Sequence, residues 1–497
     1  MRVQTLLLSP RSSLGSTGVN ADWEQMDNRI ATSPRPQPGQ PQSSDRASRL
    51  KSVIGVACGN SLEMYDFMVF GYYAKWIARA FFPLHNQINS LLLTLATFGA
   101  GFLMRPLGAV LLGGYTDRHG RRAGLLLTLS LMAVGTATIG LTPGYATIGL
   151  AAPFIVVTGR LLQGLSAGAE LGTASVYLSE IAPEGRKGLY VSFQSASQQV
   201  SVMGAASIGI LLVKGLPETA LDDWGWRIPL LVGCALIPFL FWIRRSMAET
   251  VLTGANRRRM TGREIGDSLI RNWRILLIAT FFTALTTTAF YFITVYTLTF
   301  GVSELKLASK DALRVTLFVG LLNVIVLPVM GRLSDRVGRR TLLWTASLAF
   351  LLTAYPSIHW LVSAPSFDRL LAVELWCAFL YASYNAAMVV YLTEIMPPEV
   401  RATSFSLAYS LATALFGGFT PFVCTYVIKE TGNKAAPGLW LSLAAFSAVC
   451  AVAVTYVRRS LVSRSSYNWS ARRETESDPK RTTEFHKPIE QGISERS

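Results

Sequence analysis

Twelve apolar stretches, each long enough to cross a lipid bilayer, follow one another between residues 52 and 458. A helix needs about 20 mostly apolar residues to span the hydrocarbon core, where only helices and closed barrels are stable. Charged residues make up 15% of the chain, whereas soluble domains average about 25%. The sequence therefore predicts an all-α integral membrane protein with twelve transmembrane helices. The expected spans are 52–82, 88–115, 123–142, 149–180, 188–213, 226–245, 272–300, 311–333, 341–362, 369–395, 402–428 and 437–458.

Lysine and arginine residues gather in alternate loops of this predicted bundle. The loops between them contain few basic residues, which acids partly balance. Because cytoplasmic loops of membrane proteins carry an excess of Lys and Arg, the basic loops and both termini are expected to be cytoplasmic. The net charge of +16 would also suit a nucleic-acid-binding protein, but no amphipathic basic face supports that partner. The basic loops are 117–122, 183–187, 244–274, 335–340 and 397–401.

Composition divides the chain into five segments. Residues 1–50 and 460–497 are polar and charged, which predicts a disordered cytoplasmic extension and a disordered cytoplasmic tail. The stretch 246–271 is the longest internal loop, and we expect it to be a cytoplasmic linker. It separates a predicted N-terminal six-helix bundle, 51–245, from a C-terminal one, 272–459. All five cysteines fall within apolar runs, so the sequence indicates neither a disulfide framework nor a metal site.

The two predicted bundles share a repeated pair of loop sequences. GGYTDRHGRR at 113–122 returns as GRLSDRVGRR at 331–340, which is 218 residues later. YLSEIAPEGR at 177–186 returns as YLTEIMPPEVR at 391–401, at an offset of 214 to 215 residues. Each pair occupies the same place in its half, after the second and after the fourth helix. The chain is thus expected to contain two parallel six-helix repeats, an arrangement found in transporters that rock two halves around a central site.

These motifs resemble those of a known family. G-x3-D-R-x-G-R-R, present twice, resembles the signature loop of the major facilitator superfamily, and GRLLQG at 159–164 resembles the fourth-helix motif of its proton-coupled members. GNSLEMYDFMVFGYYA, FGAGFLMRPLGAVLLGGYTDRHGRR and DWGWRIP are similar to the metabolite:proton symporters. Within that family, SAGAELG, SFQSASQQV and TEIMPPEVRATSFSLAYSLATALFGGFTP look most like the bacterial citrate and tricarballylate proton symporters. The resemblance covers residues 50–460.

The resemblance implies a multi-pass transporter of the bacterial inner membrane, which imports citrate or a related tricarboxylate with protons by alternating access. The same family carries 2-oxoglutarate, shikimate, proline and betaines, so these solutes stay as alternatives. The sequence has no P-loop or H-E-x-x-H motif, and its G-x-S-x-G match, GLSAG at 164–168, falls inside the fourth predicted span and not at a strand-to-helix turn. This argues against an enzyme and against ATP as the energy source. The expected partners are a small organic anion, protons and lipid, without a cofactor, and the expected state is a monomer. A non-transporting sensor on this fold would need a folded signalling domain, which neither tail resembles.

Two acids and one arginine lie inside the first two predicted spans. Glu63 and Asp66 are three residues apart and therefore share a face of their helix. Since a charge at the bilayer centre costs about 2.5–3.5 kcal/mol, such residues usually pair or face a water-filled cavity. With Tyr65 they match the first-helix acid cluster of the resembling family, which implies binding or gating; Glu63 would otherwise only reach the cytoplasmic interface. Arg105 either pairs with an acid of the first helix or grips a substrate carboxylate, and the sequence leaves both open.

The fourth predicted span carries Arg160, Gln163 and Glu170. Gln163 lies one turn beyond the arginine, and Glu170, ten residues on, falls close to the same helical face. The family motif implies that this group couples transport to protons, through an acid that releases or recaptures the arginine as it gains or loses a proton. A structural pair between neighbouring helices is the alternative.

Polar side chains form stripes on three further predicted spans. Gln194 and Gln198, with two serines, share one face of the fifth span and either line the transport path or bind neighbouring helices. Tyr291 in the seventh span and Tyr409 in the eleventh can hydrogen-bond a carboxylate, a hydroxyl group or another helix. All four are candidate residues of the substrate path.

Charged residues of the repeated loops form a candidate gate. Asp117 and Asp335 come at the ends of their helices, where the following arginines and the N-termini of neighbouring helices can pair with them. Such contacts would hold the cytoplasmic side closed, while a role in topology alone is the alternative. The candidate gating residues are Asp117, Arg118, Arg121, Arg122, Glu180, Arg186, Asp335, Arg336, Arg339, Arg340, Glu394 and Arg401.

Overall fold

The computed structural model describes residues 46–119, 121–168, 170–246, 262–397 and 400–455. The chain divides into two compact units, and the larger, Pro36–Val452, contains every contact described below. The remaining residues of the predicted tails and of the predicted linker lie outside the described residues. Within the linker range, Gly262–Arg271 is a helix, α12.

The first six predicted spans are helical in the structure. Two of them consist of consecutive helices, because α2 is followed by α3 and α7 is followed by α8. Short helices α6 and α10 and the π-helical segment η1 lie in the connections. The bounds are α2 (Arg46–Tyr72), α3 (Ala74–Phe81), α4 (Gln87–His119), α5 (Arg121–Leu141), α6 (Tyr145–Ile148), α7 (Ala151–Ala167), α8 (Glu170–Ile181), α9 (Lys187–Gly215), α10 (Glu218–Ala220), η1 (Leu221–Gly225) and α11 (Arg227–Ser246).

The last six predicted spans are also helical. The seventh is one continuous helix, Trp273–Glu304, that contains two π-helical segments, and the eleventh contains a third. Such segments replace regular hydrogen bonds locally and occur frequently at functional sites. The bounds are α13 (Trp273–Tyr291), η3 (Phe292–Tyr296), α14 (Thr297–Thr299), η4 (Phe300–Glu304), α15 (Ser309–Val337), α16 (Arg339–Ser363), α17 (Phe367–Ile395), α18 (Arg401–Ala412), η5 (Thr413–Gly417), α19 (Thr420–Thr431) and a final helix, Ala436–Thr455.

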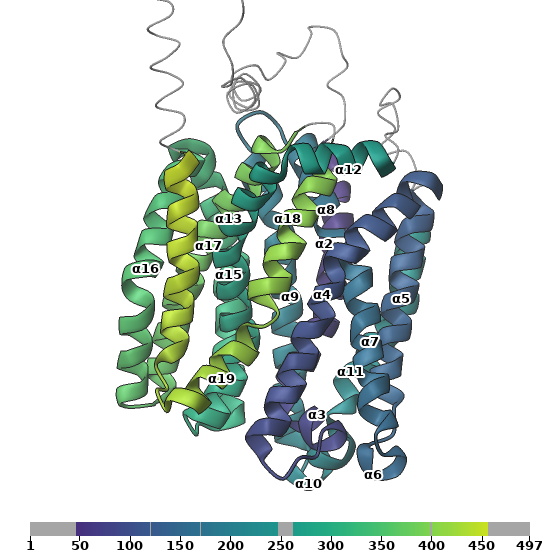
Figure 1. The fold of residues 1–497 in the computed structure, drawn as a ribbon, viewed down its shortest axis with the longest axis vertical. Helices are drawn as coiled ribbons and strands as arrows, with labels where there is room; N and C mark the ends of the chain where they lie inside the picture. The colour runs from purple at the N-terminus through teal and green to yellow at the C-terminus, as the bar shows by residue number, and fades with distance from the viewer. Residues whose placement is uncertain (1–45, 120, 169, 247–261, 398–399, 456–497) are drawn as a thin grey trace, which may run out of the picture. The chain divides into compact units, whose positions relative to one another are not determined.

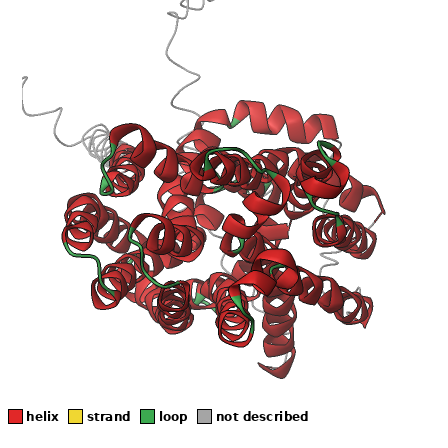
Figure 2. Cartoon of the chain, turned by 90° about the horizontal axis from the view of Figure 1, so that it is seen from below, coloured by secondary structure: helices red, strands yellow, loops and turns green. Residues whose placement is uncertain are grey.

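All regular elements in the described ranges are helices (Figure 2). Eight of them are long and apolar enough to cross a membrane, and Leu126–Leu141 and Ala151–Ala167 are shorter apolar helices of the same bundle. With α2 and α11, they account for the twelve spans that the hydropathy pattern predicts. The predicted all-α, twelve-helix fold is therefore confirmed for the described part of the chain.

The sequence duplication extends to the packing of the helices. In the first half, α7 packs against α4 and α5, while α2 packs against α9. The corresponding contacts of the second half are α17 against α15 and α16, and α13 against α18. The halves meet where α9 packs along α15 and where α4 packs against α18 and η5 (Figure 1). We call the end with the repeated loops the motif end, and the opposite end, with α3, α6 and α10, the far end.

Glycines let the helices of the first half approach one another closely. A Cβ on Gly164 of α7 would collide with the carbonyl group of Gly101 in α4. Gly135 of α5 and Gly159 of α7 face each other, since a Cβ on either would lie 2.7–3.0 Å from the other's carbonyl oxygen. Small residues at crossings are a usual means by which membrane helices pack. This close approach sets α7, with its polar side chains, directly against α4 and α5.

Replacing Gly164 by leucine is expected to destabilise the fold by about 3 kcal/mol, because backbone atoms of α4 cannot swing aside as a flexible side chain would. Gly204→Leu is the matched control, since Gly204 is also helical and nothing lies within 4 Å of a Cβ placed there. The melting temperatures of the two variants will be compared by heating each in detergent and measuring the remaining folded protein by size-exclusion chromatography. Equal melting temperatures would contradict the close packing of α4 and α7.

Candidate functional site

A chain of hydrogen bonds joins Asp66 to Arg160 through two other side chains. Arg160 Nη1 on α7 donates to Gln163 Oε1 at 2.7 Å. Gln163 Nε2 donates to Thr136 Oγ1 on α5 at 2.8 Å, and the Thr136 hydroxyl donates to Asp66 Oδ2 on α2 at 2.5 Å. Three helices thus contribute to one polar group, which we call the Asp66–Arg160 relay.

Both ends of the relay are buried and incompletely satisfied. Asp66 is 4% exposed and Arg160 is 1% exposed. Asp66 Oδ1 and the Nε and Nη2 atoms of Arg160 have no hydrogen-bond partner within the described residues. Buried charged groups normally have partners, because an unpaired charge in apolar surroundings is costly. The acid can therefore accept a proton, and the arginine can accept an anion.

Gly233 of helix α11 leaves space for the Asp66 carboxylate. A Cβ on Gly233 would collide with Asp66 Oδ1, so only glycine fits at that position without a rearrangement. The neighbouring Tyr65 hydroxyl donates to the carbonyl oxygen of Pro229 at 3.1 Å and ties α2 to α11. Asp66 accordingly faces the interior of the first half, between α5 and α11.

Two arginines share one aromatic cage. The guanidinium carbon of Arg160 lies 3.6 Å from the centre of the Phe70 ring. That of Arg105 lies 5.1 Å from the centre of Phe67 and 5.0 Å from the centre of Phe102. Since cation–π attraction contributes about 0.5–2 kcal/mol, the rings stabilise both cations away from water. The cage consists of Phe67, Phe70, Phe98, Phe102 and Tyr291.

Tyr291 of α13 brings the second half into the cage. Its ring lies 5.0 Å from that of Phe102, edge to face. Its hydroxyl lies within electrostatic reach of Glu63, Arg105 and Arg160. The two arginines and the half-buried Glu63 therefore meet at the interface between the repeats.

Two further tyrosines of the second half lie close to Tyr291. Tyr409 on α18 interacts electrostatically with Tyr291 and Arg105. Tyr381 on α17 interacts with Tyr291 and Tyr409. A Cβ on Gly417 of η5 would lie 2.9 Å from the Tyr291 ring, so this glycine leaves the ring its space. Tyrosine hydroxyl groups from three helices of the second half thus lie close to one another, and those of Tyr291 and Tyr409 interact with Arg105.

This arrangement suits an organic anion with several carboxylates. Each guanidinium presents a planar fork of N–H donors, which matches the two oxygens of a carboxylate. The tyrosine hydroxyls can donate to further carboxylate or hydroxyl oxygens. Because the site is buried among aromatic rings, such charge-assisted hydrogen bonds would be stronger than the same bonds in water.

The polar stripe of α9 binds α2 in this structure. Asn60 Nδ2 donates to the carbonyl oxygen of Gln194 at 2.8 Å and to Ser197 Oγ at 3.1 Å. Gln194 Nε2 and Gln198 Nε2 donate in return to Asn60 Oδ1, at 3.2 Å and 3.4 Å. The stripe therefore makes interhelical hydrogen bonds, which was one of the two readings of its sequence. The side chain of Glu170, at the start of α8, lies outside the described part of the structure.

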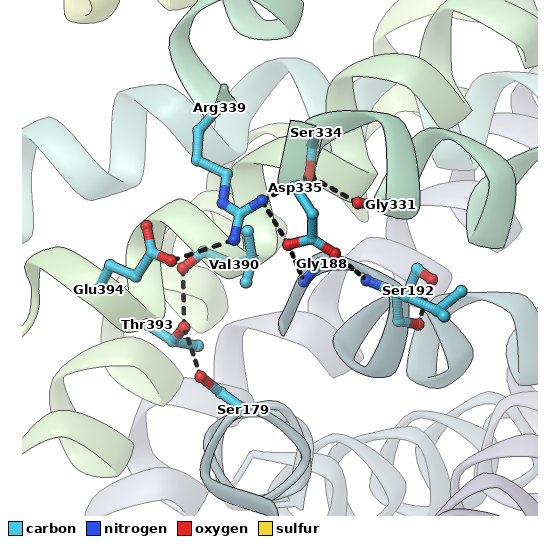
Figure 3. Close-up of polar contacts among 11 residues, drawn as sticks. Ser179, Gly188, Ser192, Gly331, Ser334, Asp335, Arg339, Val390, Thr393 and Glu394 are labelled. Atoms are coloured by element: carbon cyan, nitrogen blue, oxygen red, sulfur yellow. Dashed lines mark hydrogen bonds and ion pairs between the residues drawn. The ribbon is translucent and has the colours of Figure 1, made fainter. Parts of the chain in front are cut away.

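At the motif end, Asp335 links the two repeats (Figure 3). Its carboxylate accepts hydrogen bonds from the backbone amides of Gly188 at 2.8 Å and Leu189 at 3.1 Å, in the first turn of α9. Arg339 donates to Asp335 Oδ1 at 2.7 Å and to Glu394 Oε1 at 3.3 Å. The contacts expected of Asp335, with a following arginine and a neighbouring helix N-terminus, are thus present. We call this group the motif-end latch.

A second contact joins the two repeats at the same end. The Thr393 hydroxyl on α17 lies 3.3 Å from Ser179 Oγ on α8 (Figure 3). Among the other candidate gating residues, Glu180, Arg186 and Arg336 are exposed, and Arg340 and Arg401 are partly buried. The side chains of Asp117, Arg118, Arg121 and Arg122 lie outside the described residues.

Some members of the site carry no signal in the sequence. Thr136 is one of several threonines in an apolar helix, and the cage phenylalanines resemble any lipid-facing residue. Tyr381 could be found only by its helical spacing from other polar residues of α17. In the residues that the structure describes, no group of three or more His, Cys, Asp or Glu side chains could hold a metal ion.

The fold and the site together define a class of protein. It is a polytopic membrane protein of two six-helix repeats, with a buried cationic site between the repeats and polar contacts that join them at the motif end. The sequence profile of the Major Facilitator Superfamily matches residues 56–421 and 312–491. The chain belongs to this superfamily, as the sequence motifs predict.

Curated relatives and solved structures agree with this assignment. The chain is 52% identical to the citrate-proton symporter of Salmonella typhi over 84% of this chain and 96% of that protein. It is 35% identical to the alpha-ketoglutarate permease of Escherichia coli K12, over 79% of this chain and 90% of the permease. The fold is similar to that of a D-xylose-proton symporter, with a TM-score of 0.65 at 17% identity over 82% of this chain and 97% of the other.

Proposed function

We propose that this protein imports citrate or a related tricarboxylate together with protons, by alternating access of the cage to the two sides of the membrane. The observation that carries the proposal is the pair of buried arginines, Arg105 and Arg160, which both lie over the ring of Phe67. The 52% identity to citrate-proton symporters supports this substrate class. The protein is a transporter of the inner membrane and not an enzyme.

Anion binding is the task of the cage. Arg105 and Arg160 would hold two carboxylates of the substrate through forked hydrogen bonds. Tyr291 and Tyr409, from the second half, would donate to the remaining oxygens, so that a bound anion draws the halves together. Gln194 and Gln198 would keep α2 in register with α9 while the halves move.

Proton binding is the task of the relay. A proton on Asp66 removes the charge that orients Thr136, Gln163 and Arg160, and so leaves the arginine free to turn toward the substrate anion. Loss of the proton restores the relay and weakens the hold on the anion. Tyr65 would fix the position of Asp66. Glu63, which lies on α2 with these two residues, would act electrostatically on Tyr291 of α13. Glu170 would serve as a further acid on the fourth span.

Orientation and energy source complete the proposal. The motif end would face the cytoplasm, as the basic loops indicate, with both termini on that side. The motif-end latch and the repeated loop charges would hold that side closed until substrate and proton are bound. Transport would be driven by the proton gradient without a cofactor, by a monomer.

The purified protein in liposomes provides the test. An inward gradient of one pH unit should raise citrate accumulation by about tenfold for each coupled proton, because one unit stores about 1.4 kcal/mol per proton. Radiolabelled citrate uptake is measured with and without an uncoupler. Accumulation that survives the uncoupler would contradict proton coupling.

Competition identifies the substrate. Unlabelled citrate and tricarballylate should suppress uptake, whereas shikimate, proline and betaine should not, because they lack a second carboxylate for the second arginine. Suppression by 2-oxoglutarate alone would favour the dicarboxylate of the E. coli relative instead. Binding of one of these solutes without any exchange across the membrane would favour a non-transporting sensor.

A further inference from the structure

Glu374 is a buried acid that belongs neither to the relay nor to the cage. It lies on α17, seven residues after the helix begins at Phe367, and hence about 10 Å inward from the far end. The residue is 1% exposed, and its Oε2 atom has no hydrogen-bond partner in the described part of the structure. Because a buried ionised carboxylate needs compensation, this position calls for a function.

The other carboxylate oxygen is in contact with the seventh span. The Thr297 hydroxyl, in α14, lies 2.9 Å from Glu374 Oε1. The same hydroxyl lies 2.9 Å from the carbonyl oxygen of Ile293 and 3.2 Å from that of Phe292, in the π-helical segment η3. A hydroxyl has one hydrogen to donate, so Thr297 can serve only one of these three acceptors fully at a time.

Charged groups on the helices around Glu374 are engaged elsewhere. Among the described residues no cation pairs with Glu374, and the titratable group that feels its charge is the Cys377 thiol, one turn along the same helix. Asp311 and Arg314 of α15 pair with each other at 3.2 Å. Of the other titratable groups on these helices, the Tyr296 hydroxyl is buried and lies within electrostatic reach of Cys424 and Glu304. The His359 ring contacts the Tyr355 ring, Arg369 bonds the Trp360 carbonyl, and Lys214 is exposed.

The helix segment that Thr297 belongs to lies between Glu374 and the first half. Gly301, one turn further, packs against Ala312 of α15 and Leu370 of α17. The opposite face of this segment lines a small cleft at the far end, together with α2 and α3 of the first half. The cleft is lined by Leu298, Thr299, Val302 and Ser303 of this span, by Tyr72, Lys75 and Trp76 of α2 and α3, and by Leu91 and Ser309. A single helix segment therefore separates Glu374 from the far-end contact between the repeats.

We propose that Glu374 is a second proton-binding site of the transport cycle, and that Thr297 transmits its charge state to the outer part of the seventh span; this inference rests on the proposed function. With a proton on Oε1, the carboxyl donates to Thr297 Oγ1, and the hydroxyl donates to Ile293. When the proton leaves to water, Thr297 turns its hydrogen to the carboxylate and releases the π-helical carbonyl. The far-end contact is thereby closed with the proton bound and loosened without it.

Helix α17 connects this acid to the substrate site. Tyr381 lies seven residues, or two turns, beyond Glu374 and therefore on the same face. Its hydroxyl interacts with Tyr291 and Tyr409 at the edge of the cage. A proton bound at Glu374 and an anion bound in the cage would thus both act on side chains of the same face of α17.

The test compares Glu374→Gln with wild type in proteoliposomes. Glutamine can donate to Thr297 as the protonated acid does, so citrate exchange between equal pools should stay within about twofold of wild type. The number of protons taken up per citrate should fall by one, as measured by simultaneous citrate flux and internal pH. An unchanged proton-to-citrate ratio overturns the proposal. If the wild-type protein shows no proton-coupled citrate uptake, the proposed function itself is wrong. That outcome is distinct from failure of the Glu374 proposal, in which wild type is coupled and Glu374→Gln has the same proton-to-citrate ratio.

Thr297→Val decides the matter if Glu374→Gln does not fold. Removing the hydroxyl that stabilises the ionised carboxylate should raise the external pH of half-maximal uptake by about one unit. Thr294→Val is the matched control, because Thr294 lies in η3 of the same span and, among the described residues, its hydroxyl donates to the Phe290 carbonyl of its own helix. Equal midpoints for wild type, Thr297→Val and Thr294→Val would overturn the proposal.

Discussion

Citrate uptake by Arg160→Lys will fall by about a hundredfold or more, although the positive charge is retained. Lysine cannot reproduce the fork that bonds Gln163 at 2.7 Å while two further N–H groups remain available. Disturbing one partner of a buried charged group typically costs about 3–5 kcal/mol, and each 1.4 kcal/mol is a factor of ten. Initial rates of proton-driven uptake in proteoliposomes, with protein amounts matched, measure the effect.

The same exchange at an exposed site provides the control. Arg79 pairs with Asp222 at 2.7 Å, and both side chains are about 40% exposed, so Arg79→Lys should change uptake less than twofold. Gln163→Leu breaks the relay without removing the guanidinium. It should impair proton-driven uptake more than citrate exchange. An Arg160→Lys rate within threefold of wild type would show that charge alone suffices and would refute the forked-binding mechanism.

The sequence predicted the helices and the latch because both depend on local patterns. Each span is visible as an apolar stretch of the sequence, and the offset of 214 to 218 residues between the repeated loop motifs indicates the duplication. Asp335 lies at the end of its predicted helix with three arginines directly after it, so a pair with one of them was expected, and the structure forms it with Arg339. The pairing of Asp335 with α9 follows once the helix order is known.

The interior of the site was less predictable, because it depends on which faces of distant helices meet. The sequence suggested an acid near an arginine, but not that Thr136 and Gln163 stand between Asp66 and Arg160. Phenylalanine is common in membrane helices, so the cage around Arg105 leaves no distinct trace. Glu374 belongs to no recognised motif, so the sequence marks it only as an acid early in the tenth predicted span, and its burial against Thr297 is what the structure adds.

Asp335→Asn will open the motif end, and the backbone amides at the start of α9 will then exchange their hydrogens faster. The carboxylate accepts from Gly188 and Leu189 and pairs with Arg339. An asparagine amide keeps one acceptor but turns a donor toward the second amide. Hydrogen bonds to charged groups contribute about 1.5–3 kcal/mol, so the closed state should lose about 3 kcal/mol, a hundredfold in its equilibrium. Hydrogen–deuterium exchange of the peptide that contains 187–192 should accelerate accordingly.

Two variants locate the origin of that effect. Arg339→Gln removes the ion pairs to Asp335 and Glu394 but leaves the carboxylate on α9, so exchange should accelerate less than in Asp335→Asn. Asp311→Asn breaks a partly exposed pair with Arg314 at the far end and should leave the α9 peptide unchanged. If Arg339→Gln matches Asp335→Asn, the arginine network and not the helix N-terminus closes this end. If none of the three variants changes the exchange, the contacts of Asp335 do not limit opening, and the latch must be sought in the remaining repeated-loop charges.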